Sequence, residues 1–148
     1  MGTVKNAEEE PCVCSQLRRT ARLVSLVYDE ALAPAGLSVT QYALLARIGR
    51  TQGLSRTALA AQLGMERTTL TRNLSPLERA GLVISKPAED RREKILQLTA
   101  LGRKQAAAAK PRWLAAQERM LRHLGKKRWH ALRDLLSASE QVLSLPAK

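Results

Sequence analysis

Hydrogen-bonding side chains recur along one face of a predicted helix at residues 66–81, ERTTLTRNLSPLERAG. Leu70, Leu74 and Leu77 have the i, i+4, i+7 spacing of a buried helical face, which leaves threonine, serine and arginine on the opposite face. The second helix of a helix-turn-helix contacts base edges mainly with its N-terminal part. The candidate DNA contacts are therefore Arg67, Thr68, Thr71, Arg72 and Ser75. Arg72 has the donor geometry to pair bidentately with a guanine.

A second group of charged residues lies between two short predicted strands. Residues 82–86 (LVISK) and 94–99 (KILQLT) are rich in β-branched residues and leucine, and they flank the polar stretch PAEDRRE. This pattern predicts an antiparallel hairpin, or wing, that reaches a minor groove. Arg91 and Arg92 suit the negative potential of a narrow A·T-rich groove. Asp90 would hold one of these arginines by a charge-assisted hydrogen bond.

These contacts require two helices with a tight turn between them. Residues 55–64, SRTALAAQLG, predict the first helix, and Gly64 can adopt the left-handed conformation of a sharp interhelical turn. We expect the second helix to begin near Glu66, to bend at Pro76 and to end at Gly81. The order helix, turn, helix, hairpin is that of a DNA-binding lobe.

Two segments of this lobe resemble the winged-helix regulators of the multiple antibiotic resistance regulator (MarR) family. They are LSRTALAAQLGMERTTLTRNLSPLERAGLV and DRREKILQLTALG, and the likeness extends over roughly residues 12–143. The wing motif of the family is matched by Asp90, Arg92, Leu98, Thr99 and Gly102. The resemblance implies that Arg92 is the wing-tip arginine. It also implies a homodimeric repressor or activator whose affinity for DNA changes when it binds a small molecule or is oxidised.

The fold class that we predict is mainly α with a small β-hairpin wing. A winged helix-turn-helix lobe at 38–99 is flanked by dimerisation helices at 12–34 and 100–148, and together they form a single MarR-like domain at 12–148 after a disordered N-terminus at 1–11. The terminal helices carry more apolar surface than one small lobe could cover, which predicts a homodimer. Such a dimer would place two recognition helices on a palindromic operator in double-stranded DNA, with half-sites roughly 10 bp apart.

Capping patterns set the expected helix boundaries. Ser38 and Gln41 have the spacing of a capping box, which predicts a helix running toward Gly53. Thr99 is expected to start a long helix that ends at Leu124.

Composition favours a polyanionic partner. The formal net charge is +12 and the isoelectric point is near 10.7, so binding to DNA should weaken steeply with salt. Residues 100–148 hold eleven of the basic residues against three acidic ones, outside the predicted DNA-binding lobe. The cluster Lys126, Lys127 and Arg128 belongs to this excess, and no DNA contact is predicted for it.

Other classes of protein are disfavoured by the sequence. The absence of a long apolar run and of a secretory signal predicts a cytoplasmic chain without a membrane span. Two cysteines spaced Cys-x-Cys fall short of the four ligands of a zinc site, even if His123 or His130 joined them, so we expect no metal and no cofactor. We also expect no enzymatic activity, because the sequence has neither a phosphate-binding glycine loop nor a recognisable nucleophile and base.

The cysteines Cys12 and Cys14 are candidates for redox sensing. Tyr28 lies fourteen residues after Cys14 on the same helical stripe, about 21 Å along one helix. If the first helices of two subunits pack antiparallel, Cys14 of one can approach Tyr28 of the other, whose hydroxyl would stabilise a thiolate or sulfenate. The spacing resembles that of the organic-hydroperoxide-sensing branch of the family, although Arg18 stands where that branch has a second tyrosine.

Other interpretations of the same residues remain open. In one, the cysteines are structural, and the signal is a small aromatic or amphiphilic anion bound between the dimerisation helices and the winged lobe. A carboxylate would then be held by Arg18, Arg19 or Arg22, with Tyr42 or Trp113 stacking on the ligand. In another, the winged helix is a protein-interaction module that does not bind DNA.

Overall fold

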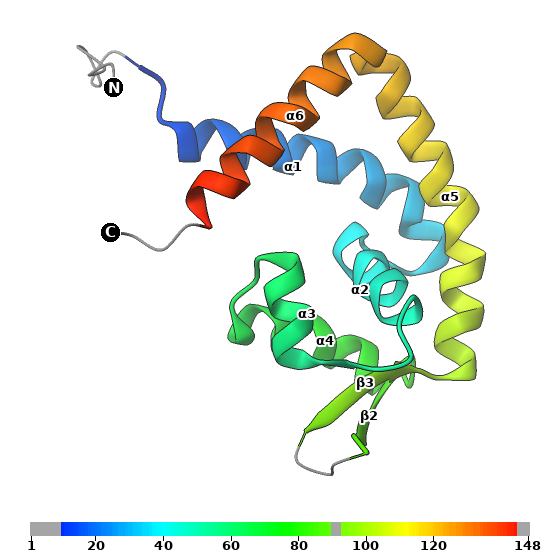
Figure 1. Cartoon of the computed structure of the whole chain (residues 1–148). Helices are drawn as coiled ribbons and strands as arrows, with labels where there is room; N and C mark the ends of the chain where they lie inside the picture. Colours follow the sequence, from blue (N-terminus) through cyan, green and yellow to red (C-terminus); the bar gives the residue numbers. More distant parts are fainter. Residues whose placement is uncertain (1–9, 90–92, 145–148) are drawn as a thin grey trace.

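The computed structural model describes residues 10–89 and 93–144. Most of these residues form helices, and the rest include a small sheet (Figure 1). In chain order the elements are α1 (Val13–Leu32), the 3-10 helix η1 (Ala33–Ala35), α2 (Val39–Gly49), β1 (Leu54–Ser55), α3 (Arg56–Leu63), α4 (Arg67–Arg79), β2 (Val83–Pro87), β3 (Lys94–Leu98), α5 (Ala100–Leu124) and α6 (Lys126–Leu143).

The helices divide into a winged lobe and three terminal helices, α1, α5 and α6, which we call the arms. In Figure 1, α2, α3, α4 and the sheet form the lower lobe, while α5 rises from the sheet along one side of the molecule to the corner where α6 begins. In the same view, the start of α1 and the end of α6 lie on the side opposite to α5. The predicted fold class, a winged helix-turn-helix with helical N- and C-terminal segments, is confirmed.

The sheet has one strand more than the predicted hairpin. Its order is β1-β3-β2, and both pairings are antiparallel. Leu54 in β1 lies opposite Leu96 in β3. Gly53 leads into β1 with φ +155°, and a Cβ on it would lie 2.6 Å from Cδ1 of Ile95. A side chain at position 53 would therefore require the Ile95 side chain to move.

The helix ends of the winged lobe follow the predicted turns. Gly64 ends α3 in the left-handed conformation, with φ 60°, and α4 begins at Arg67 with Glu66 as its N-cap. After α4, the amide of Gly81 donates to the Glu78 carbonyl and the amide of Leu82 donates to the Leu77 carbonyl, the hydrogen-bond pair of a Schellman motif. The predicted sharp turns at Gly64 and Gly81 are confirmed.

The capping box of α2 is also confirmed, but the helix is shorter than predicted. The Ser38 hydroxyl accepts from the Gln41 amide, and the Gln41 side chain accepts from the Ser38 amide. The Asp29 carboxylate adds a second cap by accepting from the Val39 amide at 2.7 Å, so α1 is tied to the start of α2. α2 ends at Gly49, four residues before Gly53, because the chain must turn there to enter β1.

A close backbone contact joins the wing to α5. Thr99 caps α5 by accepting from the Gly102 amide at 2.9 Å, and its hydroxyl donates to the Gly81 carbonyl. The Thr99 amide donates to the carbonyl of Leu82. A Cβ at position 102 would lie only 2.0 Å from that carbonyl oxygen. The start of α5 is therefore fixed against the turn that follows α4.

The core fills the space between α2, α4 and the sheet. It is built mainly from leucines, and its buried members include Leu44, Leu59, Leu70, Leu74 and Leu96. Among the residues described by the structure, no helix is both long enough and apolar enough to span a membrane.

Candidate nucleic-acid interface

α4 has one buried apolar face and one exposed polar face. Leu70, Leu74 and Leu77 are buried against the lobe, as their spacing predicted. The opposite face is formed by Arg67, Thr68, Thr71, Arg72 and Ser75; the first four are exposed and Ser75 is half-buried. The structure therefore brings the sequence-predicted helix contacts together on one surface, which we call the polar face of α4.

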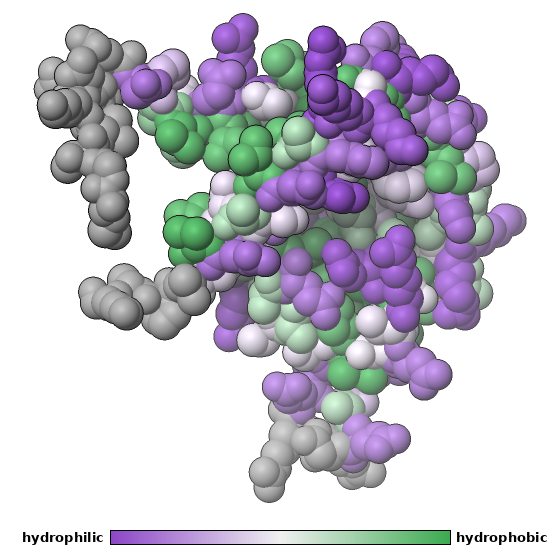
Figure 2. All heavy atoms as spheres, turned by 45° about the horizontal axis from the view of Figure 1, so that its top comes forward, coloured by the Kyte–Doolittle hydropathy of each residue, from purple (hydrophilic) through white to green (hydrophobic). Residues whose placement is uncertain are grey.

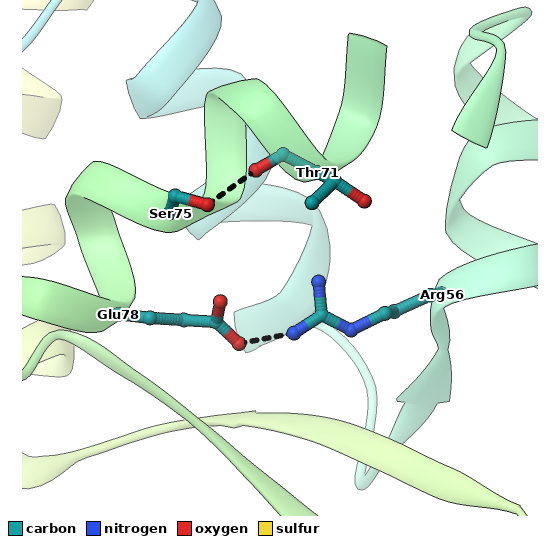
Figure 3. Close-up of polar contacts among 4 residues, drawn as sticks. All are labelled: Arg56, Thr71, Ser75 and Glu78. Atoms are coloured by element: carbon teal, nitrogen blue, oxygen red, sulfur yellow. Dashed lines mark hydrogen bonds and ion pairs between the residues drawn. The ribbon is translucent and has the colours of Figure 1, made fainter. Parts of the chain in front are cut away.

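The hydroxyl of Ser75 differs from the other side chains of this face because it has a partner inside the helix. It donates to the Thr71 carbonyl at 2.8 Å (Figure 3). Such back-bonding fixes the serine rotamer and satisfies its donor. Ser75 thus has less freedom to contact a base than Thr71 or Arg72.

An ion pair joins the two helices of the helix-turn-helix beside this face. The guanidinium of Arg56, the first residue of α3, donates to the carboxylate of Glu78 in the last turn of α4. Figure 3 shows this pair on the side of α4 from which Thr71 and Ser75 also project. Side-chain exposure is 31% for Arg56 and 27% for Glu78, so the pair is partly shielded from water.

The structure describes both strands of the wing, as far as Glu89 and again from Glu93. β2 and β3 pair from Val83 opposite Leu98 to Pro87 opposite Lys94, and the Ala88 amide donates to the Glu93 carbonyl beyond the last pair. The sequence-predicted wing contacts Asp90, Arg91 and Arg92 lie outside the described residues. Of the described wing residues, Lys86 and Lys94 are exposed cations on the strands that lead to the tip.

Three aromatic side chains connect α1, α5 and α2. Trp113 of α5 stacks on Tyr42 of α2, with ring centroids 5.9 Å apart, and it lies 6.4 Å from the ring of Tyr28 on α1. The Tyr28 hydroxyl donates to Oε1 of Gln117. Burial raises the pKa of Tyr28, so its phenol remains a donor. Burial also raises the pKa of Tyr42, while the positive charge of Arg50 opposes that rise.

The sequence-predicted sensing residues lie at some distance from this aromatic group. Cys12 and Cys14 are exposed at the N-terminal end of α1. Arg18 and Arg22 are exposed on α1, where the Arg22 Nε donates to the Arg18 carbonyl. Arg18 precedes Tyr28 by ten residues, about 15 Å along the helix. Within one chain, the structure brings together Tyr42 and Trp113 of the predicted ligand pocket, but it shows no contact between them and these two arginines.

Comparison with known proteins identifies the family. The MarR family pattern matches residues 37–94. The structure resembles the M. tuberculosis transcriptional regulator MosR in complex with DNA, with a TM-score of 0.78, 38% identity, and coverage of 91% of this chain and 100% of that chain. This chain belongs to the MarR family. It is thus a winged-helix, DNA-binding transcriptional regulator, and the members of this family are not enzymes.

Two other relatives of the MarR-family chain have similar coverage. The transcriptional repressor CouR bound to a 23-mer DNA duplex is 27% identical, with a TM-score of 0.77 and coverage of 93% of this chain and 98% of that chain. The HTH-type transcriptional regulator YwoH of Bacillus subtilis is 29% identical over 106 residues, which are 72% of this chain and 77% of that protein.

Sequence reasoning about this MarR-family chain missed the Arg56–Glu78 ion pair. The two residues are 22 positions apart and lie on different helices, so helical periodicity does not connect them. Their positions at the start of α3 and the end of α4 could have predicted the pair, since these two helix ends approach each other when the helices cross. The Tyr28–Gln117 hydrogen bond, which spans 89 positions, had no comparable signal.

Proposed function

We propose that this regulator is a homodimeric repressor that binds a palindromic operator in double-stranded DNA. In this proposal α4 enters the major groove, the wing reaches the minor groove, and oxidation of Cys14 or a small ligand releases the DNA. The observation that carries the proposal is the polar face of α4, in which exposed arginines and threonines lie opposite a buried leucine face and beside the wing. Two similar proteins, MosR and CouR, have been solved bound to DNA, which supports the choice of partner.

Within the polar face, some side chains would read bases directly, while others would position the helix on the DNA. Arg72 is assigned to a guanine because a bidentate arginine contact discriminates one base pair. Arg67, Thr68 and Thr71 would contact neighbouring base edges or phosphates near the start of α4. Arg56 would hold α3 and α4 at a fixed crossing through Glu78, so its first role is to position the polar face.

The proposed dimer rests on an apolar groove along the arms. A groove of about 520 Å³ lies between α1, the second half of α5 and α6; Leu17, Val24, Trp129, Leu136 and Leu143 are among its lining residues. Figure 2 shows hydrophobic side chains on the side of the molecule where α1 begins and α6 ends. Exposed apolar surface of this extent is more favourable when a second copy covers it.

The exposed residues of α6 extend this apolar surface beyond the groove. The exposed fractions are 68% for Leu135 and 69% for Val142, neither of which lines the groove. The groove also borders α1 from Leu17 to Tyr28, and Cys14 lies one turn before Leu17. A partner α1 packed antiparallel in this region would bring its own Cys14 toward Tyr28, as the redox proposal requires.

In the redox proposal, an organic hydroperoxide is the oxidant. The Cys14 thiolate attacks the peroxide, the O–O bond breaks, and sulfenic acid and an alcohol result after proton transfer. The Cys12 thiol can then displace water from the sulfenic acid to form a disulfide. Cys12 is the N-cap of α1 and Cys14 lies in the first turn, so a disulfide between them would require this end of the helix to unwind. That change would alter the packing of α1 against a partner subunit.

The alternative signal is a small amphiphilic anion, and the stacked pair Tyr42 and Trp113 favours it. This pair joins α2 of the winged lobe to α5, so a molecule that separates or tightens it would alter the spacing of the two recognition helices. A ligand acts in this way only if it binds one spacing more tightly than the other.

The test is selection of bound duplexes from random double-stranded DNA, followed by footprinting of the best sequence. We expect a two-fold-symmetric site whose half-sites lie roughly 10 bp apart. Release is then screened with cumene hydroperoxide and with aromatic carboxylic acids. Equal binding of all duplexes at physiological salt would contradict sequence-specific recognition.

A further inference from the structure

A group of exposed cations lies where α5 ends and α6 begins. Its members are Arg122 near the end of α5 and Lys126, Lys127 and Arg128 in the first turn of α6, and we call them the corner cluster. From residue 119 to residue 133 the sequence has six basic residues and no acidic one. The corner cluster is therefore a surface of one charge sign.

Most of these charges are not neutralised by neighbouring side chains. The three cations of α6 form no ion pair in the described part of the chain. Arg122 lies 3.8 Å from Glu118, but both side chains are 71% exposed, so water screens this pair. The cations of α6 also lie at the positive end of the helix dipole, where their charge is unfavourable. The corner cluster therefore contributes little to the stability of the chain.

The corner cluster is remote from the polar face of α4 and from the wing. In Figure 1 the corner between α5 and α6 is at the top, and the wing is at the bottom. α5 begins against the turn that follows α4, and its 25 residues span about 37 Å. This length is several times the Debye length of about 8 Å at physiological salt. A duplex bound to α4 and the wing would therefore be screened from the cluster.

The cluster also lies outside the apolar groove of the arms. Trp129, Leu132 and Leu136 turn one side of α6 toward that groove, and none of the four cations lines it. A second copy of the chain seated in the groove therefore need not cover the cluster.

The composition of the cluster favours phosphate over an acidic protein. Protein interfaces are built around apolar and aromatic anchors and are poor in lysine. Here the adjacent apolar side chains, Leu124 and Trp129, line the groove instead. Lysine binds phosphate as a point charge, without the planar geometry that selects a particular group. Such contacts with the regular phosphates of a duplex give binding without base preference.

We propose that the corner cluster binds the phosphate backbone of a second DNA duplex, so that one regulator holds two DNA segments at once. The first segment lies on α4 and the wing, and the second lies at the other end of α5. A regulator already bound to one segment raises the local concentration of the other, so weak phosphate contacts suffice for the second. This site goes beyond the proposed function, which uses only α4 and the wing for DNA and assigns no role to the cluster.

A capture assay with the full chain tests this bridging. A short duplex is fixed to beads, the protein is bound to it, and a fluorescent duplex of unrelated sequence is added at low salt. We expect the beads to retain the fluorescent duplex and to release it as salt rises. A protein that binds the bead duplex but retains no second duplex would overturn the proposal.

A pair of matched variants assigns the bridging to the cluster. Lys126→Glu with Lys127→Glu should lower retention of the second duplex by about tenfold or more, while affinity for the bead duplex stays within about twofold. Glutamate suits the first turn of a helix, so this variant should fold, which circular dichroism verifies. Lys110→Glu with Arg112→Glu makes the same change in net charge at exposed positions near the middle of α5 and should retain the second duplex.

The results that contradict the proposal differ from each other. Unchanged retention by the cluster variant would assign the bridging to two winged lobes of a dimer. Equal losses in the two variants would show a general effect of net charge. A matching loss of affinity for the bead duplex would place the cluster in the first interface. Each of these results would overturn the proposal.

Acetylation of lysines, measured by mass spectrometry, locates the second duplex directly. In excess duplex, Lys126 and Lys127 should react several-fold more slowly, as should Lys86 and Lys94 of the wing, while Lys110 reacts as before. Protection of the wing alone would overturn the proposal and leave the proposed function intact. Stronger protection of Lys126 and Lys127 by poly-glutamate than by DNA of equal charge would indicate an acidic protein partner and also overturn it. Because duplexes of any sequence serve, the outcome does not depend on whether the protein selects an operator.

Discussion

Arg56 and Glu78 connect the first residue of α3 to the last turn of α4, and their ion pair borders the polar face of α4. Both side chains are less than one third exposed, so solvent screens the attraction less than it would at the open surface. The contact closes the helix-turn-helix at the end opposite Gly64, where the turn already fixes the two helices. The orientation of α4 is therefore set at both of its ends.

A double-mutant cycle measures this connection. Arg56→Ala and Glu78→Ala should each lower the free energy of unfolding by roughly 1 kcal/mol, and the double variant should lose little more than either single one. Urea unfolding gives the three values. Arg79→Ala is the control, because Arg79 is exposed and has no ion pair in the described part of the chain. Additive losses would show that the pair contributes no coupling.

Arg72 and Ser75 should differ sharply in their effect on sequence preference. Arg72→Ala is expected to remove roughly 1–3 kcal/mol of discrimination at one base pair of each half-site while nonspecific affinity remains. Ser75→Ala should alter the preference little, because its hydroxyl already donates to the Thr71 carbonyl. Selection from random DNA gives both profiles, and an unchanged Arg72→Ala profile would remove this residue from direct readout.

Much of the winged lobe follows from local patterns in the sequence. The leucine spacing of α4, the glycine turns and the capping box of α2 are each determined by residues within one or two turns of each other, so they were predictable. β1 was missed because a two-residue strand has no periodicity and exists only through its pairing with β3. The Tyr28–Gln117 hydrogen bond was missed for a related reason: its two residues come from helices that meet only in the fold.

The structure explains why the family wing motif has a glycine at position 102, and this explanation predicts an effect on stability. Gly102→Ala should destabilise the protein by roughly 3 kcal/mol, because the new Cβ would collide with the Leu82 carbonyl oxygen, 2.0 Å away. Gly64→Ala is a matched comparison: its φ of 60° is strained for alanine, but nothing lies within 4 Å of an added Cβ. It should cost only about 1 kcal/mol. Thermal and urea unfolding compare the two, and equal losses would contradict a specific clash at Gly102.

The roles of Cys14 and Cys12 can be distinguished by how their serine variants respond to peroxide. Cumene hydroperoxide should release the parent from its operator, while Cys14→Ser should stay bound. In Cys12→Ser, Cys14 should still be oxidised, but its sulfenic acid would persist and be trapped by dimedone, since the resolving thiol is absent. Gel-shift titration and mass spectrometry follow release and adducts. Equal release of the parent and Cys14→Ser would leave the cysteine without a sensing role.

The apolar groove of the arms gives the sharpest test of the dimer. Leu17 and Leu143 line it and are largely exposed in the single chain, so a charge at either position should leave the fold of one subunit intact. In a dimer the same charge would be buried without a partner, and Leu17→Glu should raise the dimer dissociation constant by more than about 100-fold. Leu101→Glu is the control, because Leu101 is 54% exposed at the start of α5 and lies outside the groove. Sedimentation equilibrium measures the dissociation constants. A parent that sediments as a monomer, or a Leu17→Glu variant with unchanged association, would place the dimer contact elsewhere and leave the groove without the proposed role.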